Sequence, residues 1–208
     1  MIVLTLAAAP LHAADPDVDK LLARLVRPAP DSTSFVEVRY SSLLEKPIVV
    51  SGRLEHREDG SLVRRVEWPY QEVTELQGEN VSVERAGSRP RRFTLGRAPE
   101  LRGMLASFGA ILQGDRDTLD EYFIVTARGS DSRWEVTLTP RDDKLGRRLS
   151  RIAVDGTDNR PQCFTLEEPD GDCSLMALGV AGPGELPASL DRDLLHAWCT
   201  GRGQAVGR

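Results

Sequence analysis

The amino-acid sequence predicts a mainly β (α+β) fold: an incomplete, curved antiparallel β-barrel of about 10–11 strands, with helices lining or covering its concave face. Residues 34–85 read as successive strands with little between them, and residues 123–178 read as further strands at hairpin spacing. Between these two runs, the apolar period changes from two to 3.6, which is typical of a helix. A large sheet built from hairpins tends to curl, so its concave face offers a surface on which the helices can bury their apolar stripes.

The composition is that of one globular domain. The chain has 208 residues, of which 40% are hydrophobic and 5% are aromatic, so it can bury one substantial core. Its formal net charge of −5 is mild, and its arginines are interleaved with acidic residues. No basic face therefore suggests a nucleic-acid partner.

The N-terminus has the shape of a secretory signal peptide. Residues 2–9 are apolar, Pro10 follows, and Ala13 and Ala14 are small residues of the kind found at cleavage sites. No Lys or Arg precedes the apolar run, and the alternative is a buried N-terminal helix. We expect a signal peptide at residues 1–14, a half-barrel domain at residues 15–180, and a C-terminal extension at residues 181–208.

Two amphipathic helices are predicted. The first begins at Asp15, an N-cap residue followed by Pro16, and it carries Val18, Leu21, Leu22, Leu25 and Val26 at helical spacing. The second covers residues 98–114 and ends at Gly114, a typical C-terminal residue of a helix. Shorter helical segments are expected at residues 117–122 and 190–198.

The strands follow from alternating apolar residues and from turn signals. The first run is expected at residues 34–41, 48–57, 61–68, 71–77 and 81–85, with a short strand at 89–95. Asp59–Gly60 and Gly78–Asn80 are turn signals within this run. The second run is expected at residues 123–127, 134–139, 149–154, 162–167 and 173–178. Segments rich in Gly, Asp, Asn and Ser separate these strands.

The chain has three cysteines, which lie near its C-terminal end. Cys163 and Cys173 flank the turn-forming stretch EEPDGD, so they are candidates for a disulfide across a hairpin in an oxidising compartment. A Cys173–Cys199 pair stays open as an alternative. We expect no metal site, because the sequence has neither a CxxC motif nor a Cys/His cluster.

The order of these elements resembles the periplasmic outer-membrane lipoprotein carrier family, the LolA-like proteins, of which this chain would be a divergent member. The resemblance rests on a leading Leu-rich helix, FVEVRY, GRLEHREDGSLVRRVEWPYQE, the Gly78–Asn80 turn, PELRGMLASFGAILQGD, WEVTLTPRD and LSRIAVDG. It implies an incomplete barrel closed by a helical lid, with an apolar cavity that receives acyl chains. It also implies a periplasmic protein whose partners are a lipoprotein or lipid-like cargo, an inner-membrane donor and an outer-membrane acceptor. We expect a monomer.

The apolar stripes of the two helices are the candidate ligand-binding surface. They contain Leu22 and Leu25 in the first helix, and Leu101, Met104, Leu105, Phe108, Ile111 and Leu112 in the second. A flexible, Met-bearing surface suits varied apolar ligands. The alternative is that these side chains are permanent core.

Three arginines are candidates for gating or for contact with a partner. The resemblance implies a gating role for an Arg near the end of the second strand, and Arg57 is the nearest match, although Glu58 rather than Pro follows it. We expect Arg57, Arg64 and Arg65 at the mouth of the barrel, where they can pair with a lipid head group or with the acids of a partner. The alternative for all three is a solvated strand face.

The sequence favours binding over catalysis. It contains no GxSxG, no HExxH and no Gly-rich phosphate loop, so we expect neither an enzyme nor a cofactor. The expected function is a carrier or chaperone that hides the acyl part of its cargo and delivers it toward the outer membrane. The alternatives are a non-transporting envelope interaction protein with a filled barrel, and an enzyme acting on a lipid intermediate.

Overall fold

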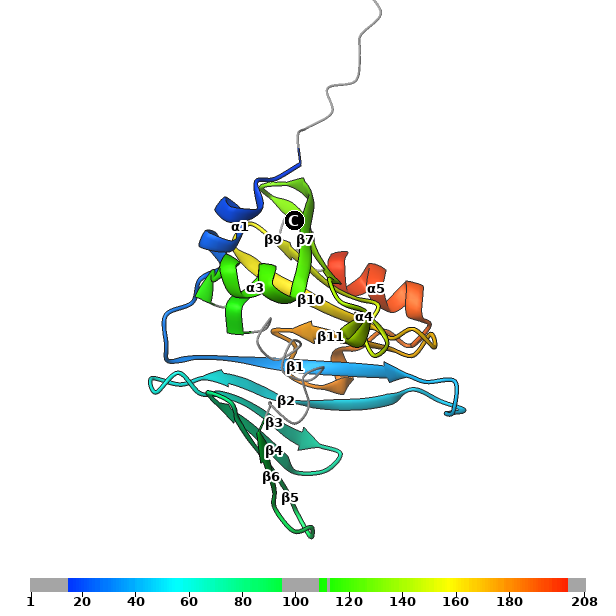
Figure 1. Cartoon of the computed structure of the whole chain (residues 1–208). Helices are drawn as coiled ribbons and strands as arrows, with labels where there is room; N and C mark the ends of the chain where they lie inside the picture. Colours follow the sequence, from blue (N-terminus) through cyan, green and yellow to red (C-terminus); the bar gives the residue numbers. More distant parts are fainter. Residues whose placement is uncertain (1–14, 95–108, 112, 202–208) are drawn as a thin grey trace, which may run out of the picture.

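The protein is built around one antiparallel sheet of eleven strands (Figure 1). The computed structural model describes residues 15–94, 109–111 and 113–201. The strands are β1 (Asp31–Tyr40), β2 (Ile48–His56), β3 (Leu62–Trp68), β4 (Glu72–Gln77), β5 (Asn80–Arg85), β6 (Arg91–Thr94), β7 (Phe123–Ser130), β8 (Arg133–Pro140), β9 (Arg151–Thr157), β10 (Arg160–Glu167) and β11 (Cys173–Leu178). All of these strands were predicted, and their ends differ from the prediction by at most three residues.

The strand order is β6-β5-β4-β3-β2-β1-β11-β10-β9-β8-β7. Most neighbours are consecutive hairpin strands, but β1 and β11 pair in the middle of the sheet, from Phe35 opposite Leu178 to Tyr40 opposite Cys173. Strands β6 and β7 are consecutive in the chain and lie at opposite edges.

The helices are α1 (Val18–Leu25), α3 (Arg116–Tyr122), α4 (Asp143–Gly146) and α5 (Arg192–Gly201), with a short 3-10 helix, η2 (Pro183–Glu185). The predicted N-cap at Asp15 is wrong. Asp17 caps α1 instead, because its carboxylate accepts hydrogen bonds from the backbone amides of Asp19 at 3.0 Å and Lys20 at 3.3 Å. Helix α4 was not predicted, since it is only four residues long. No helix in the described ranges is long and apolar enough to cross a membrane.

The main core lies on the concave face of the sheet, under α1 and α3 (Figure 1). It joins helix residues to the inward side chains of the strands: Leu21, Leu22, Leu25, Phe35, Val50, Val66, Ala110, Ile111, Leu119, Phe123, Val125, Ala127, Trp134, Val136, Leu138, Leu145, Leu149, Ile152, Val154, Phe164 and Met176. A Cβ on Gly109 would lie 3.5 Å from Leu62 Cδ1 of β3, and one on Gly114 would lie 2.8 Å from Val26 Cγ2. Gly109 therefore lies beside β3, and Gly114 lies beside the C-terminal end of α1.

A second core covers the opposite face. It contains Val36, Val38, Cys163, Leu175, Ala177, Val180, Leu195 and Cys199. Helix α5 packs there against β10, and the Tyr40 hydroxyl donates a hydrogen bond of 3.0 Å to the Leu190 carbonyl oxygen. The C-terminal segment from residue 181 to residue 201 is therefore packed against the sheet.

The predicted Cys163–Cys173 disulfide is wrong. Cys163 is bonded to Cys199 of α5, and Cys173 is a free, buried thiol. The hairpin register explains the difference, because Cys163 lies opposite Ala177 while Cys173 lies opposite Glu167. The two cysteines are thus on adjacent strands but far apart along them, beyond the reach of a disulfide. The alternative Cys173–Cys199 pair is wrong as well.

Candidate functional site

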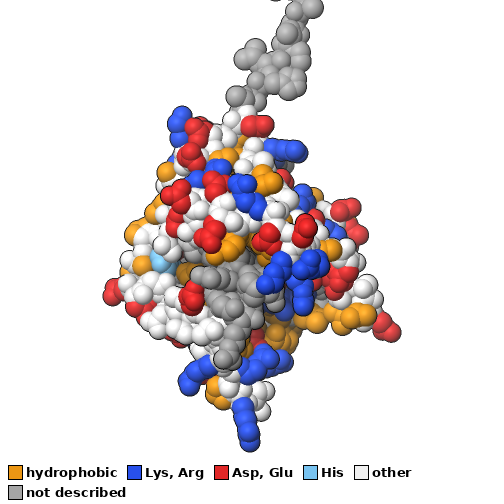
Figure 2. Space-filling view, viewed as in Figure 1, with side chains coloured by type: hydrophobic (Ala, Val, Ile, Leu, Met, Phe, Trp, Pro, Cys, Tyr) orange, Lys and Arg blue, Asp and Glu red, His pale blue; other side chains and the backbone are white. Residues whose placement is uncertain are grey.

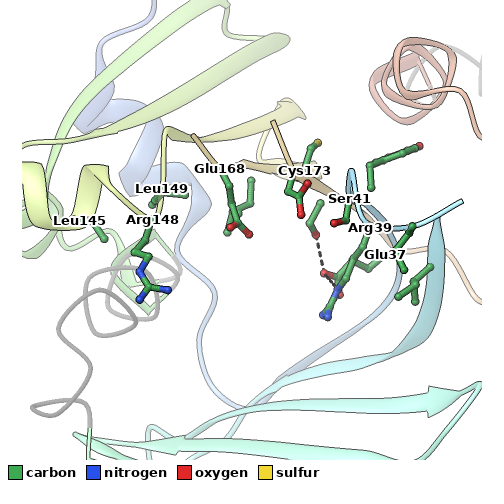
Figure 3. Close-up of a pocket in the computed structure, with 14 residues that line it drawn as sticks. Glu37, Arg39, Ser41, Leu145, Arg148, Leu149, Glu168 and Cys173 are labelled. Carbon is green, nitrogen blue, oxygen red and sulfur yellow. Dashed lines mark hydrogen bonds and ion pairs between the residues drawn. The ribbon is translucent and has the colours of Figure 1, made fainter. Parts of the chain in front are cut away.

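A cavity of about 540 Å³ opens at the end of β1 on the concave side of the sheet (Figure 3). Its walls come from the ends of β1 and β10, the starts of β2 and β11, and the segment around α4. The apolar lining is Leu44, Ile48, Leu145, Leu149 and Leu166, and the charged lining is Glu37, Arg39, Arg148, Glu168 and Asp172. Its volume falls in the range of small-molecule sites.

Strand alternation places the charged side chains of β1 in this cavity. Val36 and Val38 point to the second core, so Glu37 and Arg39 point to the concave face. Arg39 lies opposite Ser174 of β11, and Ser174 also lines the cavity.

The opposite wall is positioned by α4. Asp142 caps this helix by accepting hydrogen bonds of 2.8 Å from the amides of Lys144 and Leu145. The chain then stays coiled, since the amides of Arg148 and Leu149 donate to the Leu145 carbonyl oxygen at 2.9 and 3.0 Å. This turn directs Leu145, Arg148 and Leu149 toward the cavity.

Glu37 is the centre of a buried ion-pair network. Its side chain is 7% exposed. Arg39 donates through Nε at 2.7 Å and through Nη2 at 3.1 Å, the Ser174 hydroxyl donates at 2.7 Å, and Arg64 of β3 donates to the other carboxylate oxygen. The Arg64 guanidinium also lies 5.0 Å above the centre of the Phe35 ring. Two arginines from different strands are therefore held against one carboxylate.

The network keeps Glu37 ionised. Burial raises the pKa of this carboxyl, but the hydrogen bond from Arg39, the charges of Arg64 and Arg39, and the hydrogen bond from Ser174 outweigh it and lower the pKa to about 2. Since two cations meet one anion, the network leaves a positive balance on the floor of the concave face.

The turn between β1 and β2 forms an apolar rim for the cavity. Leu44 and Ile48 line the cavity, and each is 42% exposed, while the adjacent Leu43 is 91% exposed. The Ser42 amide donates to Asp172 at 2.9 Å, which ties this turn to the turn before β11. Figure 2 shows hydrophobic side chains gathered at the lower right, where Figure 1 places the end of the β1–β2 hairpin.

The predicted ligand-binding residues are only partly described. Leu22, Leu25 and Ile111 are 1–2% exposed and belong to the main core, and none of them lines the cavity. Leu101, Met104, Leu105, Phe108 and Leu112 lie outside the described residues. The role of the two helical stripes in binding stays a prediction.

The three candidate arginines do not come together. Arg64 is on the concave face and pairs with Glu37. Arg65, the next residue, points to the opposite face and pairs with Glu55 at 3.4 Å. Arg57 pairs with Glu55 at 3.3 Å and with Glu75 at 3.6 Å on that same opposite face. Only Arg64 is therefore placed next to the cavity, and a gating role for Arg57 stays a prediction.

The sequence reasoning missed the Glu37–Arg39 pair and the α4 wall. A usable signal existed for the first. In FVEVRY, Phe35, Glu37 and Arg39 share one face of a strand, so two opposite charges continue the face that Phe35 buries. For Arg148 no comparable signal existed, because its position depends on the packing of a four-residue helix.

No curated protein matches this chain significantly. Among solved structures, the chain is similar to a DUF1329 family protein from Desulfovibrio piger (16% identity, TM-score 0.43, covering 86% of this chain and 97% of that one). It is also similar to a LolA superfamily protein from Nitrosomonas europaea (11%, 0.40, 81% and 93%). A third similar structure is the MucA/MucB complex of Pseudomonas aeruginosa (18%, 0.34, 86% of this chain and 60% of that one). These scores are too low to carry a functional argument.

The sequence profile of one family matches nearly the whole chain. The matched region is residues 8–199, which includes both runs of strands, the α4 wall of the cavity and most of α5. The curved open sheet, with helices on its concave face, is consistent with that assignment. This chain belongs to the family described as outer membrane lipoprotein carrier protein LolA-like.

Proposed function

We propose that this protein is an envelope carrier that holds the apolar part of a lipoprotein or another lipophilic molecule in the cavity at the end of β1. The observation that carries the proposal is the cavity itself. It is about 540 Å³ in volume and combines five apolar side chains with an exposed apolar rim at Leu43 and Leu44. Burying an alkyl chain there would gain about 0.8 kcal/mol per CH₂ group.

The carrier mechanism is sequestration and release. The cavity hides the alkyl chain from water, and the chain leaves when an acceptor binds the open form better than the closed form, since only differential affinity can shift the balance. The proposed location is the periplasm, with an inner-membrane donor and an outer-membrane acceptor. Nothing in this mechanism requires covalent chemistry, so the proposal is a binding protein and not an enzyme.

The packing of the main core supports a second candidate, an envelope interaction protein that carries nothing. Leu22, Leu25 and Ile111 fill the concave face beside the cavity as tightly as ordinary core residues. If the rest of the face were filled in the same way, only the outer surface would be available to partners.

Lipid extraction separates the two candidates. The protein is purified from its own cell envelope without detergent, extracted with organic solvent, and titrated with a fluorescent fatty acid. The carrier proposal predicts co-purified lipid and saturable binding of the probe at one site per chain. A protein that yields no lipid and does not bind the probe would be the interaction protein instead.

A further inference from the structure

The charged side chains of the cavity differ in how many hydrogen-bond partners they have within the protein. Glu37 already accepts hydrogen bonds from Arg39, Arg64 and Ser174. Asp172 accepts from the Ser42 amide in the adjoining turn. Two of the three acids in the lining are therefore occupied by groups of the protein itself.

The two arginines of the lining, Arg39 and Arg148, can still donate hydrogen bonds to a ligand. Arg148 makes no ion pair with any other residue in the described part of the chain. Arg39 uses Nε and Nη2 for Glu37, which leaves Nη1 without a hydrogen bond to a described residue. Figure 3 shows the two side chains on opposite sides of the cavity, both extending downward in the view, with Glu168 between them.

The third acid, Glu168, lies close enough to Arg148 to interact with its charge. Burial and the charges of Asp170 and Asp172 raise the pKa of the Glu168 carboxyl, and the charge of Arg148 lowers it. Figure 2 also shows basic side chains over the region where Figure 1 places α4. The sequence there supplies Lys144, Arg147 and Arg148.

We propose that the cavity selects amphiphiles with an anionic head group, which lies against Arg148 while the alkyl chain contacts Leu145, Leu149 and Leu166. This inference rests on the proposed carrier function and adds the chemical class of the ligand. A carboxylate and a phosphate share the required chemistry, since both accept hydrogen bonds from guanidinium groups. The apolar side chains next to the arginines explain why a chain and a head group would bind together.

The test compares ligands that differ only in the head group. Hexadecanoic acid, 1-hexadecanol and 1-palmitoyl lysophosphatidate are titrated at pH 8 against the purified protein, by displacement of a neutral fluorescent lipid. The acid and the lysophosphatidate should bind about tenfold more tightly than the alcohol, because an ionic hydrogen bond adds to the same chain burial. Acetate and inorganic phosphate at the same concentrations should displace nothing.

A matched pair of variants locates the head group. Arg148→Gln should lower the affinity for the acid and the lysophosphatidate about tenfold and leave the alcohol unchanged. Arg147→Gln is the control, since Arg147 is an exposed neighbour that does not line the cavity, and it should change no affinity. Both side chains are exposed, so thermal unfolding should show that both variants fold normally.

The outcomes separate the two proposals. If the acid and the alcohol bind equally, or if Arg148→Gln lowers both affinities alike, the anionic head-group site is wrong and the carrier function stands. If acetate or phosphate alone displaces the probe, the site recognises free anions, and the amphiphile proposal is wrong. If no ligand of any kind binds, the carrier function fails, and this inference fails with it.

Discussion

The Glu37 carboxylate of β1 and the Arg64 guanidinium of β3 are bonded across the intervening strand β2, on the floor of the concave face. The arginine reaches over the ring of Phe35 to make this contact. Because Arg39 and Ser174 bind the same carboxylate, Glu37 links strands β1, β3 and β11 through one side chain. This link fixes the wall of the cavity on which Arg39 stands.

Removal of this charge should destabilise the protein. Glu37→Gln leaves Arg39 and Arg64 without their buried anion, and we expect the free energy of unfolding to fall by about 3 kcal/mol. Urea unfolding measures this loss of unfolding free energy. Glu55→Gln is the control, because Glu55 also pairs with two arginines but is more exposed, at 23%. The control should cost less than about 1 kcal/mol, and equal losses would contradict the role given to Glu37.

The stability of the protein should depend on Glu37 at acidic pH. Its pKa falls from 4.5 to about 2 on folding, so its contribution is complete above pH 4.5 and is lost as the pH falls toward 2. The lost contribution is about 3 kcal/mol. Unfolding free energies measured between about pH 5 and about pH 2 should decline less steeply in Glu37→Gln than in the wild type. Parallel curves would show that another group controls acid unfolding.

Gly52 allows β2 and β3 to approach each other at a bulge. The register shifts between Ser51 and Gly52, and a Cβ at Gly52 would lie 1.8 Å from the Arg65 carbonyl oxygen. Gly52→Ala should therefore cost about 1–3 kcal/mol in unfolding free energy. Gly146→Ala is the control, since nothing lies within 4 Å of its added Cβ. A Gly52→Ala protein as stable as this control would mean that the two strands are not so close.

The disulfide should hold α5 on the outer face of the sheet. Cys163 and Cys199 are separated by 36 residues, so losing the bond in Cys199→Ser should cost about 3–4 kcal/mol. Cys173→Ala should cost less, because Cys173 is not bonded to another cysteine. Thiol titration of the denatured, unreduced protein should find one free thiol per chain. Three thiols, or a mapped Cys163–Cys173 bond, would contradict the structure.

The strands were predictable because the information that defines them is local. Asp59–Gly60 and the turn at Gly78 mark hairpins, and alternation marks the strands beside them. The central pairing of β1 with β11 was not predictable in the same way, since it joins residues about 140 positions apart with no local signal. The Cys163–Cys199 bond was missed for the same reason, because it depends on the return of α5 to β10.

The candidate site was predicted only in outline. The concave face was expected to bury the helical stripes, and the described members Leu22, Leu25 and Ile111 lie in the core there. The cavity, however, lies at the end of β1, where strand pairing places Arg39 in the lining and a four-residue helix places Arg148 there. Arg64 and Arg65 are consecutive in a strand, so they lie on opposite faces of the sheet. Only the register of the strand decides which of the two lies on the concave face.

The central claim is that the cavity at the end of β1 holds an alkyl chain, and steric block of that cavity tests it most directly. Ile48 lines the cavity and is 42% exposed, while Ile124 of β7 is 49% exposed and lies outside it, so the two are a matched pair. A fluorescent fatty acid is titrated into Ile48→Trp and Ile124→Trp. Ile48→Trp should weaken binding at least about tenfold, since excluding two CH₂ groups forfeits roughly 1.6 kcal/mol, and Ile124→Trp should bind as the wild type does. Equal affinities in the two variants would contradict the assignment of this cavity as the binding site.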